Sequence, residues 1–253
     1  MKILGLDSSG LVAGVAIVEN DLLLAEYNVN YKKTHSQTLL PMLDELRGMI
    51  ELDMESIDAI AIASGPGSFT GLRIGSATAK GLGMALDKPL VEVPTLEGLA
   101  YNLWGTEDLV CPLIDARRGQ VYTGIYEFVK EQSEGAAQWE HNCRLSVVEP
   151  QTAVDISIII DKINQIGAGQ PGRRVIFLGD GVPVYRQVLA EQMKIPYSFA
   201  PAGQNRQCAG SIASLGAVYY AQGKTVSAAA HQPEYLRQSQ AERELAEKEQ
   251  GCK

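Results

Sequence analysis

Apolar and polar residues follow one another along this 253-residue chain in blocks that predict a regular succession of strands and helices. Three short apolar runs, at residues 2–6, 14–18 and 22–31, open the chain and are separated by brief polar turns. Connections this short join antiparallel strands, because a parallel pair needs a much longer crossover. We therefore predict that the chain begins with a three-stranded antiparallel meander.

The following blocks predict alternating helices and strands. Apolar residues at helical spacing predict a helix within residues 35–50 and another at 72–86. Strands are predicted at 59–63 and 89–93, followed by a short helix at 95–104. A meander followed by alternating helices and strands is typical of one mixed sheet with helices on its faces.

The second half of the chain begins like the first, with predicted strands at 109–114 and 121–128 around a polar turn. This repetition indicates an internal duplication. The remaining predictions are a polar loop at 130–142, a strand at 144–148, a helix or strand at 155–163, a strand at 175–178, and helices at 184–193 and 211–222.

These patterns predict an α/β protein with two similar halves. We expect an N-terminal lobe at residues 1–106 and a smaller C-terminal lobe at 107–237, with the helix at 211–222 as a candidate to pack back on the first lobe. A run dense in Glu, Lys, Arg and Gln at 238–253 forms a charged tail.

Charge and cysteine usage narrow the possible functions. The formal net charge of −8 argues against binding RNA or DNA without a partner, since that requires a basic surface. The cysteines Cys111, Cys143, Cys208 and Cys252 are scattered without a CxxC pair, which is typical of reduced thiols in a cytoplasmic protein. No apolar run is long enough to cross a membrane, so we expect no membrane association.

The most distinctive stretch is residues 63–75, with the sequence ASGPGSFTGLRIG. It joins a predicted strand to a predicted helix through a Gly-Pro-Gly turn, with Ser68 and Thr70 as candidate N-caps. Backbone N–H groups gather at such a helix N-terminus, where an anion or another chain's backbone can bind.

These motifs carry a family resemblance. The Asp-Ser-Ser-Gly turn after the first strand, the meander and the duplicated half resemble the actin, sugar-kinase and heat-shock-chaperone superfamily. Residues 63–75, together with 35–41 (HSQTLLP), 114–122 (IDARRGQVY) and 233–237 (PEYLR), are closely similar to the bacterial tRNA threonylcarbamoyladenosine biosynthesis family TsaB, also called YeaZ. The match extends over about the first 237 residues.

The resemblance implies a two-lobed actin-like ATPase fold and a non-catalytic role. TsaB proteins resemble their catalytic paralogue TsaD, which attaches a threonylcarbamoyl group to the tRNA adenosine beside the anticodon. The implied function is to stabilise TsaD in a heterodimer and to assemble the complex with TsaE. For the chain alone we expect a homodimer, in which two copies bury the same exposed apolar surface by two-fold symmetry. The net charge of −8 predicts tRNA contact only through the complex, and we expect no cofactor.

TsaD proteins carry a metal-binding HxxxH motif, and the corresponding stretch here places Thr95 and Leu99 at the two histidine positions. Neither side chain is a usual ligand of iron or zinc. The histidines of the chain, His35, His141 and His231, are not spaced as i and i+4. We therefore expect no metal site and no catalytic residue.

A nucleotide site is a separate hypothesis. In a superfamily ATPase, the acidic residue after the first strand helps to hold Mg²⁺, but it can equally cap its own turn. The later Gly-Asp-Gly is either a nucleotide contact or simply a tight turn. The candidate residues are Asp7, Ser8, Ser9, Gly179, Asp180 and Gly181.

Three further polar residues have two interpretations each. His35 is either catalytic or a helix-start residue, and no Ser or Cys partner is evident for catalysis. Arg117 and Arg118 either bind a phosphate or a partner's carboxylate, or belong to a solvated turn.

A small-residue stripe suggests a partner interface. Gly71, Gly75, Ala79 and Gly83 recur every four residues, although an interior helical glycine costs ~1 kcal/mol relative to alanine. The stripe packs either on its own sheet or against a helix of another molecule. The candidate interface residues are His35, Leu39, Met42, Leu46, Met49, Leu72, Gly75, Ala79 and Gly83, with Leu46 expected at the exposed centre.

Two alternative functions stay open at this stage. One is an ATP-dependent phosphotransferase or hydrolase that uses Asp7 and the two glycine turns. The other is a peptidase, which no Ser-His-Asp order, HExxH motif or reactive Cys-His pair supports.

Overall fold

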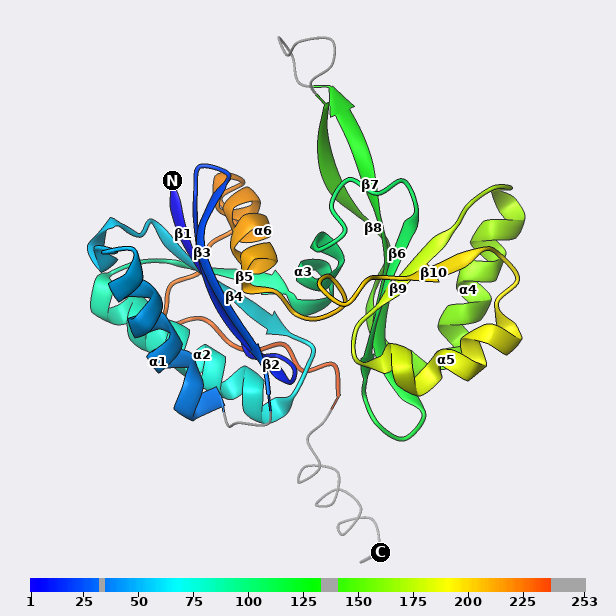
Figure 1. Ribbon diagram of the computed structural model, residues 1–253, viewed down its shortest axis with the longest axis horizontal. Helices are drawn as coiled ribbons and strands as arrows, with labels where there is room; N and C mark the ends of the chain where they lie inside the picture. Colours follow the sequence, from blue (N-terminus) through cyan, green and yellow to red (C-terminus); the bar gives the residue numbers. More distant parts are fainter. Residues whose placement is uncertain (32–34, 133–140, 238–253) are drawn as a thin grey trace, which may run out of the picture.

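The computed structural model describes residues 1–31, 35–132 and 141–237, and shows two lobes that are each built on a five-stranded mixed sheet (Figure 1). The first sheet has the order β3-β2-β1-β4-β5 and the second has the order β10-β9-β6-β7-β8. The strands are β1 (Lys2–Asp7), β2 (Val12–Glu19), β3 (Leu22–Asn30), β4 (Ala59–Gly65), β5 (Leu90–Pro94), β6 (Leu109–Asp115), β7 (Gln120–Gln132), β8 (His141–Asp155), β9 (Val175–Leu178) and β10 (Tyr197–Phe199).

The two sheets have the same connectivity. In each lobe the first three strands form an antiparallel meander, and two later strands join the other side of the first strand in parallel. The internal duplication predicted from the repeated strand–turn–strand unit is therefore present in the topology. The predicted α/β architecture with two mixed sheets and flanking helices is confirmed.

Helices cover both faces of the sheets (Figure 1). In the first lobe, α1 (His35–Met49) and α2 (Phe69–Leu86) pack on one face, while α6 (Ala209–Ala221) packs on the other. In the second lobe, α4 (Ile156–Gly169) and α5 (Gly181–Gln192) cover the outer face. The remaining helical elements are the short η1 (Met54–Ser56) and α3 (Thr95–Tyr101).

Helix α6 lies on the first sheet although it follows the second lobe in sequence. Two side chains of β3 hold its N-terminus: the Ala209 N–H donates to Asn28 Oδ1 (3.2 Å), and the Gly210 N–H donates to Glu26 Oε1 (2.6 Å). The N-cap residue Cys208 supplies no such side-chain bond. The strand therefore satisfies N–H groups that a helix leaves unpaired at its start.

Helix α3 joins the two lobes. Its residues Leu96 and Leu99 are buried in one apolar cluster with Ile114 and Tyr126 of the second sheet. We call this cluster the interlobe core. It joins the two lobes through α3.

Several predicted elements differ from the observed ones. The segment 155–163, left open between helix and strand, is helical in α4. The predicted loop at 130–142 is partly a hairpin, because β7 continues to Gln132 and β8 begins at His141. Pairing of the two strands stabilises residues whose polar composition suggested a loop; an ion pair between Arg144 and Glu131 adds to it. The middle of that loop and the charged tail lie outside the described residues.

Within the part of the chain that the structure describes, no helix is long and apolar enough to span a membrane.

Candidate functional site

A cavity of about 840 Å³ lies between the two lobes, within the size range of ligand-binding clefts. The first lobe contributes the turn after β1 and the start of α2, and the second lobe contributes the turn between β6 and β7. The lining residues are Ser9, Gly10, Leu11, His35, 67–71, Ile74, 114–118, Tyr122, Asp180, Val184 and Arg237.

Asp7, at the end of β1, is buried and does not line this cavity. Its Oδ1 accepts hydrogen bonds from the Ser9 N–H (2.8 Å) and the Ser9 hydroxyl (2.7 Å). Burial raises the pKa of Asp7 to about 6, and the two bonds from Ser9 oppose that rise. The carboxylate thus caps its own turn, which is the simpler of the two interpretations from the sequence. Nucleotide contact by Asp7, Ser8 and Ser9 stays a prediction.

The glycine-rich loop before α2 packs directly on this turn. The Ser68 N–H donates to the Ser9 carbonyl (2.7 Å), and the Ser8 hydroxyl donates to the Gly71 carbonyl (2.8 Å). A Cβ atom at Gly67 or Gly71 would collide with the backbone of this turn. The loop therefore needs glycine at both positions, and it packs on Ser8, while Ser9 still lines the cavity.

The second lobe places the other candidate turn opposite. Gly179 has a φ of 107° and packs against the Leu113 carbonyl, so a side chain there would be strained and would clash. Asp180 Oδ1 accepts the Asp115 N–H (3.0 Å), and burial raises the pKa of Asp180. These contacts are those of a tight structural turn, while nucleotide contact at Gly179, Asp180 and Gly181 stays a prediction.

Basic side chains stand at the rim of the cavity. Arg117 and Arg118 both line it and have positive φ values of 65° and 57°, which non-glycine residues seldom adopt. The Arg117 guanidinium lies 3.3 Å from Asp115 and its side chain is 87% exposed. Both arginines are therefore held in one unusual turn and are accessible to an anion.

Thr95 and Leu99, which we expect at the positions of the two TsaD histidines, are used inside the protein. Thr95 is fully buried, and its hydroxyl oxygen accepts the Gly65 N–H (3.1 Å). Leu99 is buried in the interlobe core. Among the described residues, no three His, Cys, Asp or Glu side chains are grouped so that they could hold a metal ion.

His35 is the first residue of α1, and its Nε2 lies 2.8 Å from the Gly10 carbonyl. A carbonyl only accepts, so Nε2 carries the proton. This bond joins the helix start to the turn after β1, as expected for a residue that positions a helix.

The expectation that the apolar residues of α1 and α2 form an exposed surface is wrong. Leu46 is only 4% exposed, and Leu39 and Met42 are buried with it in the core between α1 and the first sheet. The small-residue stripe also faces inward, since Gly75 packs on Ser8 and Ile62. Leu72, Ala79 and Gly83 are buried as well.

Met49, by contrast, is 74% exposed, and the sequence reasoning missed two similar residues, Leu40 on α1 and Met84 on α2. Both fall outside the regular apolar spacing of their helices. Apolar residues at that spacing form the side of the helix that packs on the sheet. An apolar residue outside that spacing is therefore the sequence signal for an exposed apolar side chain.

Comparison with known proteins identifies the family. The family model described as TsaD, tRNA N6-adenosine threonylcarbamoyltransferase, matches residues 23–245. The tRNA threonylcarbamoyladenosine biosynthesis protein TsaB of Bacillus subtilis (strain 168) is 31% identical over 242 residues, which cover 96% of each chain. The chain belongs to the TsaB family. TsaB of Escherichia coli (strain K12) is 26% identical over 254 residues, covering 98% of this chain and 100% of its own length.

A solved TsaB-family structure supports the fold. YeaZ from Pseudomonas aeruginosa superposes with a TM-score of 0.71 at 26% identity, covering 93% of this chain and 100% of its own. Membership of the TsaB family places the chain in the biosynthesis of threonylcarbamoyladenosine in tRNA.

Proposed function

We propose that this chain is the non-catalytic partner of TsaD in threonylcarbamoylation of the tRNA adenosine beside the anticodon, and that it assembles with TsaE in the same complex. The observation that carries the proposal is the TsaD family match over residues 23–245. It is combined with the expectation from the sequence that Thr95 and Leu99 stand at the TsaD histidine positions. Thr95 binds the Gly65 N–H and Leu99 packs in the interlobe core, so both positions serve the fold.

The docking surface for TsaD lies on α1 and α2. Leu40 and Met49 on α1 and Met84 on α2 are 51%, 74% and 60% exposed, and the two α1 residues lie on opposite flanks of that helix, whereas Leu46 belongs to the core. Exposed apolar side chains on two neighbouring helices can be buried against the helices of another molecule. The same surface can bury itself against a second copy by two-fold symmetry, so a homodimer and the TsaD heterodimer compete for it.

Transfer RNA contacts this chain only through the complex. The formal net charge of −8 leaves little favourable counterion release for a chain that binds RNA by itself. The arginines at the cavity rim, including Arg117 and Arg118, form a local positively charged group on this negatively charged chain.

The alternative, an ATP-dependent phosphotransferase or hydrolase, is less well supported. Such an enzyme needs the turn after β1 open to the phosphates and its metal. Here the loop at 67–71 packs on Ser8 and the carboxylate of Asp7 is buried, so of the three candidate residues in this turn only Ser9 lines the cavity.

Reconstitution tests the proposal. Unmodified tRNA that reads codons starting with A is incubated with the activated threonylcarbamoyl donor, and modified adenosine is measured by mass spectrometry. We expect no modification with this chain alone, and modification by TsaD and TsaE that increases strongly when the chain is added. Modification of tRNA by the chain alone, or no effect of the chain on TsaD, would contradict the partner role.

A further inference from the structure

The last described segment, residues 226–237, leaves the first lobe and reaches the second. It begins at the edge of the first sheet, where Val226 and Leu90 exchange two backbone hydrogen bonds of 2.9 Å each. It then runs past α2 and β4 toward the space between the lobes (Figure 1). Its last residue, Arg237, lines the cavity.

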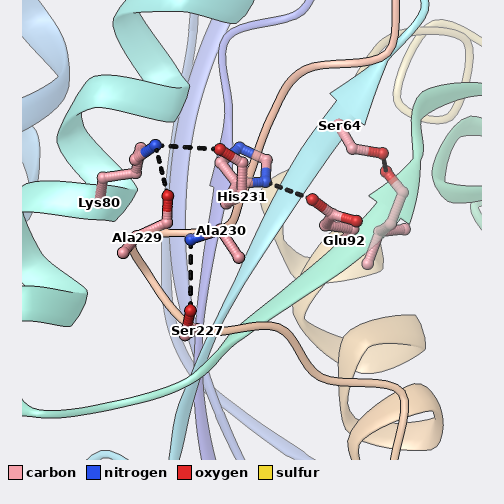
Figure 2. A network of polar contacts seen from close by, with 8 residues as sticks. Ser64, Lys80, Glu92, Ser227, Ala229, Ala230 and His231 are labelled. Carbon is pink, nitrogen blue, oxygen red and sulfur yellow. Dashed lines mark hydrogen bonds and ion pairs between the residues drawn. The ribbon is translucent and has the colours of Figure 1, made fainter.

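A polar network fixes the middle of this segment to the first lobe (Figure 2). His231 is 1% exposed, and its Nδ1 lies 2.6 Å from Glu92 Oε1 on β5. From α2, the Lys80 ammonium donates to the carbonyls of Ala229 (3.1 Å) and His231 (3.0 Å). Two elements of the first lobe thus hold the segment from both sides.

Two more contacts with the first lobe follow. The Glu234 N–H donates to the Ser64 carbonyl at the end of β4 (2.7 Å). The Tyr235 ring stacks on Phe69 at the start of α2, with 4.9 Å between centroids and 10° between planes. Such aromatic pairs stabilise beyond the area that they bury.

The same few residues also bind the second lobe. Gln151 of β8 donates from Nε2 to Glu234 Oε2 (2.6 Å). The Arg237 guanidinium donates to the Ala116 carbonyl in the turn between β6 and β7 (2.5 Å). Leu236, between them, packs against the interlobe core.

We propose that residues 233–237 form an interlobe strap that sets the separation of the two lobes and so the width of the cavity. The lobes are joined on one side by the interlobe core around α3, and the strap joins them at the cavity. A rotation that opens the cavity must break the bonds from Gln151 to Glu234 and from Arg237 to Ala116. The contacts of the strap with Ser64 and Phe69 can persist in the open form, so the strap acts as a releasable connection.

The test removes only the bonds to the second lobe. The full-length double variant Gln151→Ala/Arg237→Ala keeps the strap's contacts with Ser64 and Phe69. The matched control is Arg144→Ala, which deletes an arginine whose partner Glu131 lies in the same lobe. Small-angle scattering measures the radius of gyration, and hydrogen–deuterium exchange measures the opening of α3 and of residues 114–118.

We expect a larger radius of gyration for the double variant and roughly tenfold faster exchange in these two regions, since loss of two hydrogen bonds shifts an opening equilibrium by about that factor. The control should match the wild type. Wild-type exchange and radius of gyration in the double variant would overturn the proposal. If the double variant does not fold, the single variant Gln151→Ala is tested instead. Faster exchange in α3 and residues 114–118 would support the proposal, and unchanged exchange in both regions would overturn it.

Discussion

The Ser8 hydroxyl donates a hydrogen bond of 2.8 Å to the carbonyl of Gly71, 63 positions later in the chain. This bond ties the end of β1 to the start of α2 and draws the glycine-rich loop onto the turn after β1. The approach is so close that a Cβ at Gly71 would meet the Ser8 backbone. The most distinctive motif of the sequence thus has a structural role inside the first lobe.

Replacement of Gly71 tests this close approach. Gly71→Ala should lower the free energy of unfolding by roughly 1–3 kcal/mol, the usual cost of overpacking, because the obstacle is backbone and cannot rotate away. Gly81→Ala on the same helix is the control. Nothing lies within 4 Å of a Cβ there, so it should raise stability by about 0.5–1 kcal/mol through helix propensity. Urea denaturation measures both, and equal effects would contradict the packing argument.

A second pair of variants compares the effect on stability of truncating a buried residue of α1 with that of truncating an exposed one. Leu46→Ala should destabilise the protein by about 2–5 kcal/mol, because it leaves a cavity in the core beneath the helix. Met49→Ala should change stability by no more than about 0.5 kcal/mol, since Met49 is 74% exposed. Thermal and urea unfolding check both values. A near-neutral Leu46→Ala would show that Leu46 is not packed as the structure has it.

The buried Asp7 predicts a particular pH dependence. Its pKa of about 6 in the folded protein exceeds the ordinary value of 3.8, mainly because burial disfavours the charged form. Between these values the folded state keeps a proton that the unfolded state loses. The contribution of Asp7 to stability is therefore full below about pH 4 and falls as the pH rises through 6.

Asp7→Asn should abolish this fall, because an amide oxygen can still accept from Ser9 but carries no charge. Relative to the wild type, the variant should gain about 1–3 kcal/mol between pH 4 and pH 6.5, following 1.36 kcal/mol for each pKa unit. The measurement is the free energy of unfolding in urea at several pH values. Subtracting the value of one protein from that of the other removes the contribution of the other carboxylates, which both proteins share. A constant difference across this range would mean that Asp7 titrates normally.

The elements that the sequence predicted well are those whose periodicity is local. The meander, both long helices of the first lobe and the glycine-rich turn follow from spacing and turn residues alone. The repeated strand–turn–strand unit also predicted the duplication that both sheets display.

What the sequence could not predict depends on distant contacts. An apolar stripe on α1 is equally suited to its own sheet and to a partner, so only the fold shows that Leu46 is buried. Strand β10 has only three residues, which are too few to show the alternation of apolar and polar residues that predicts a strand. The strap at 233–237 has no regular secondary structure. Its role depends on contacts with Ser64, Phe69 and Ala116, which are far away in sequence.

The last prediction concerns docking. The double variant Leu40→Glu/Met49→Glu places one carboxylate on each flank of α1, because the two positions are half a turn apart around the helix and both native residues are more than half exposed. The monomer should keep its fold and its circular dichroism spectrum, because surface substitutions usually change stability by no more than about 0.5 kcal/mol. An uncompensated charge in a buried interface costs several kcal/mol, enough to weaken binding by orders of magnitude. We therefore expect loss of both the TsaD complex and self-association.

The control for docking is Ile158→Glu on α4, which changes an exposed apolar residue (46% exposed) of the other lobe that does not line the cavity. Analytical ultracentrifugation measures self-association, and calorimetry with purified TsaD measures the dissociation constant. Ile158→Glu should bind TsaD as the wild type does. Because homodimer and heterodimer are proposed to use one surface, the two affinities should fall together in the α1 variant. Wild-type affinity for TsaD in that variant would place the docking surface elsewhere, and loss of only one assembly would show that the two use different surfaces.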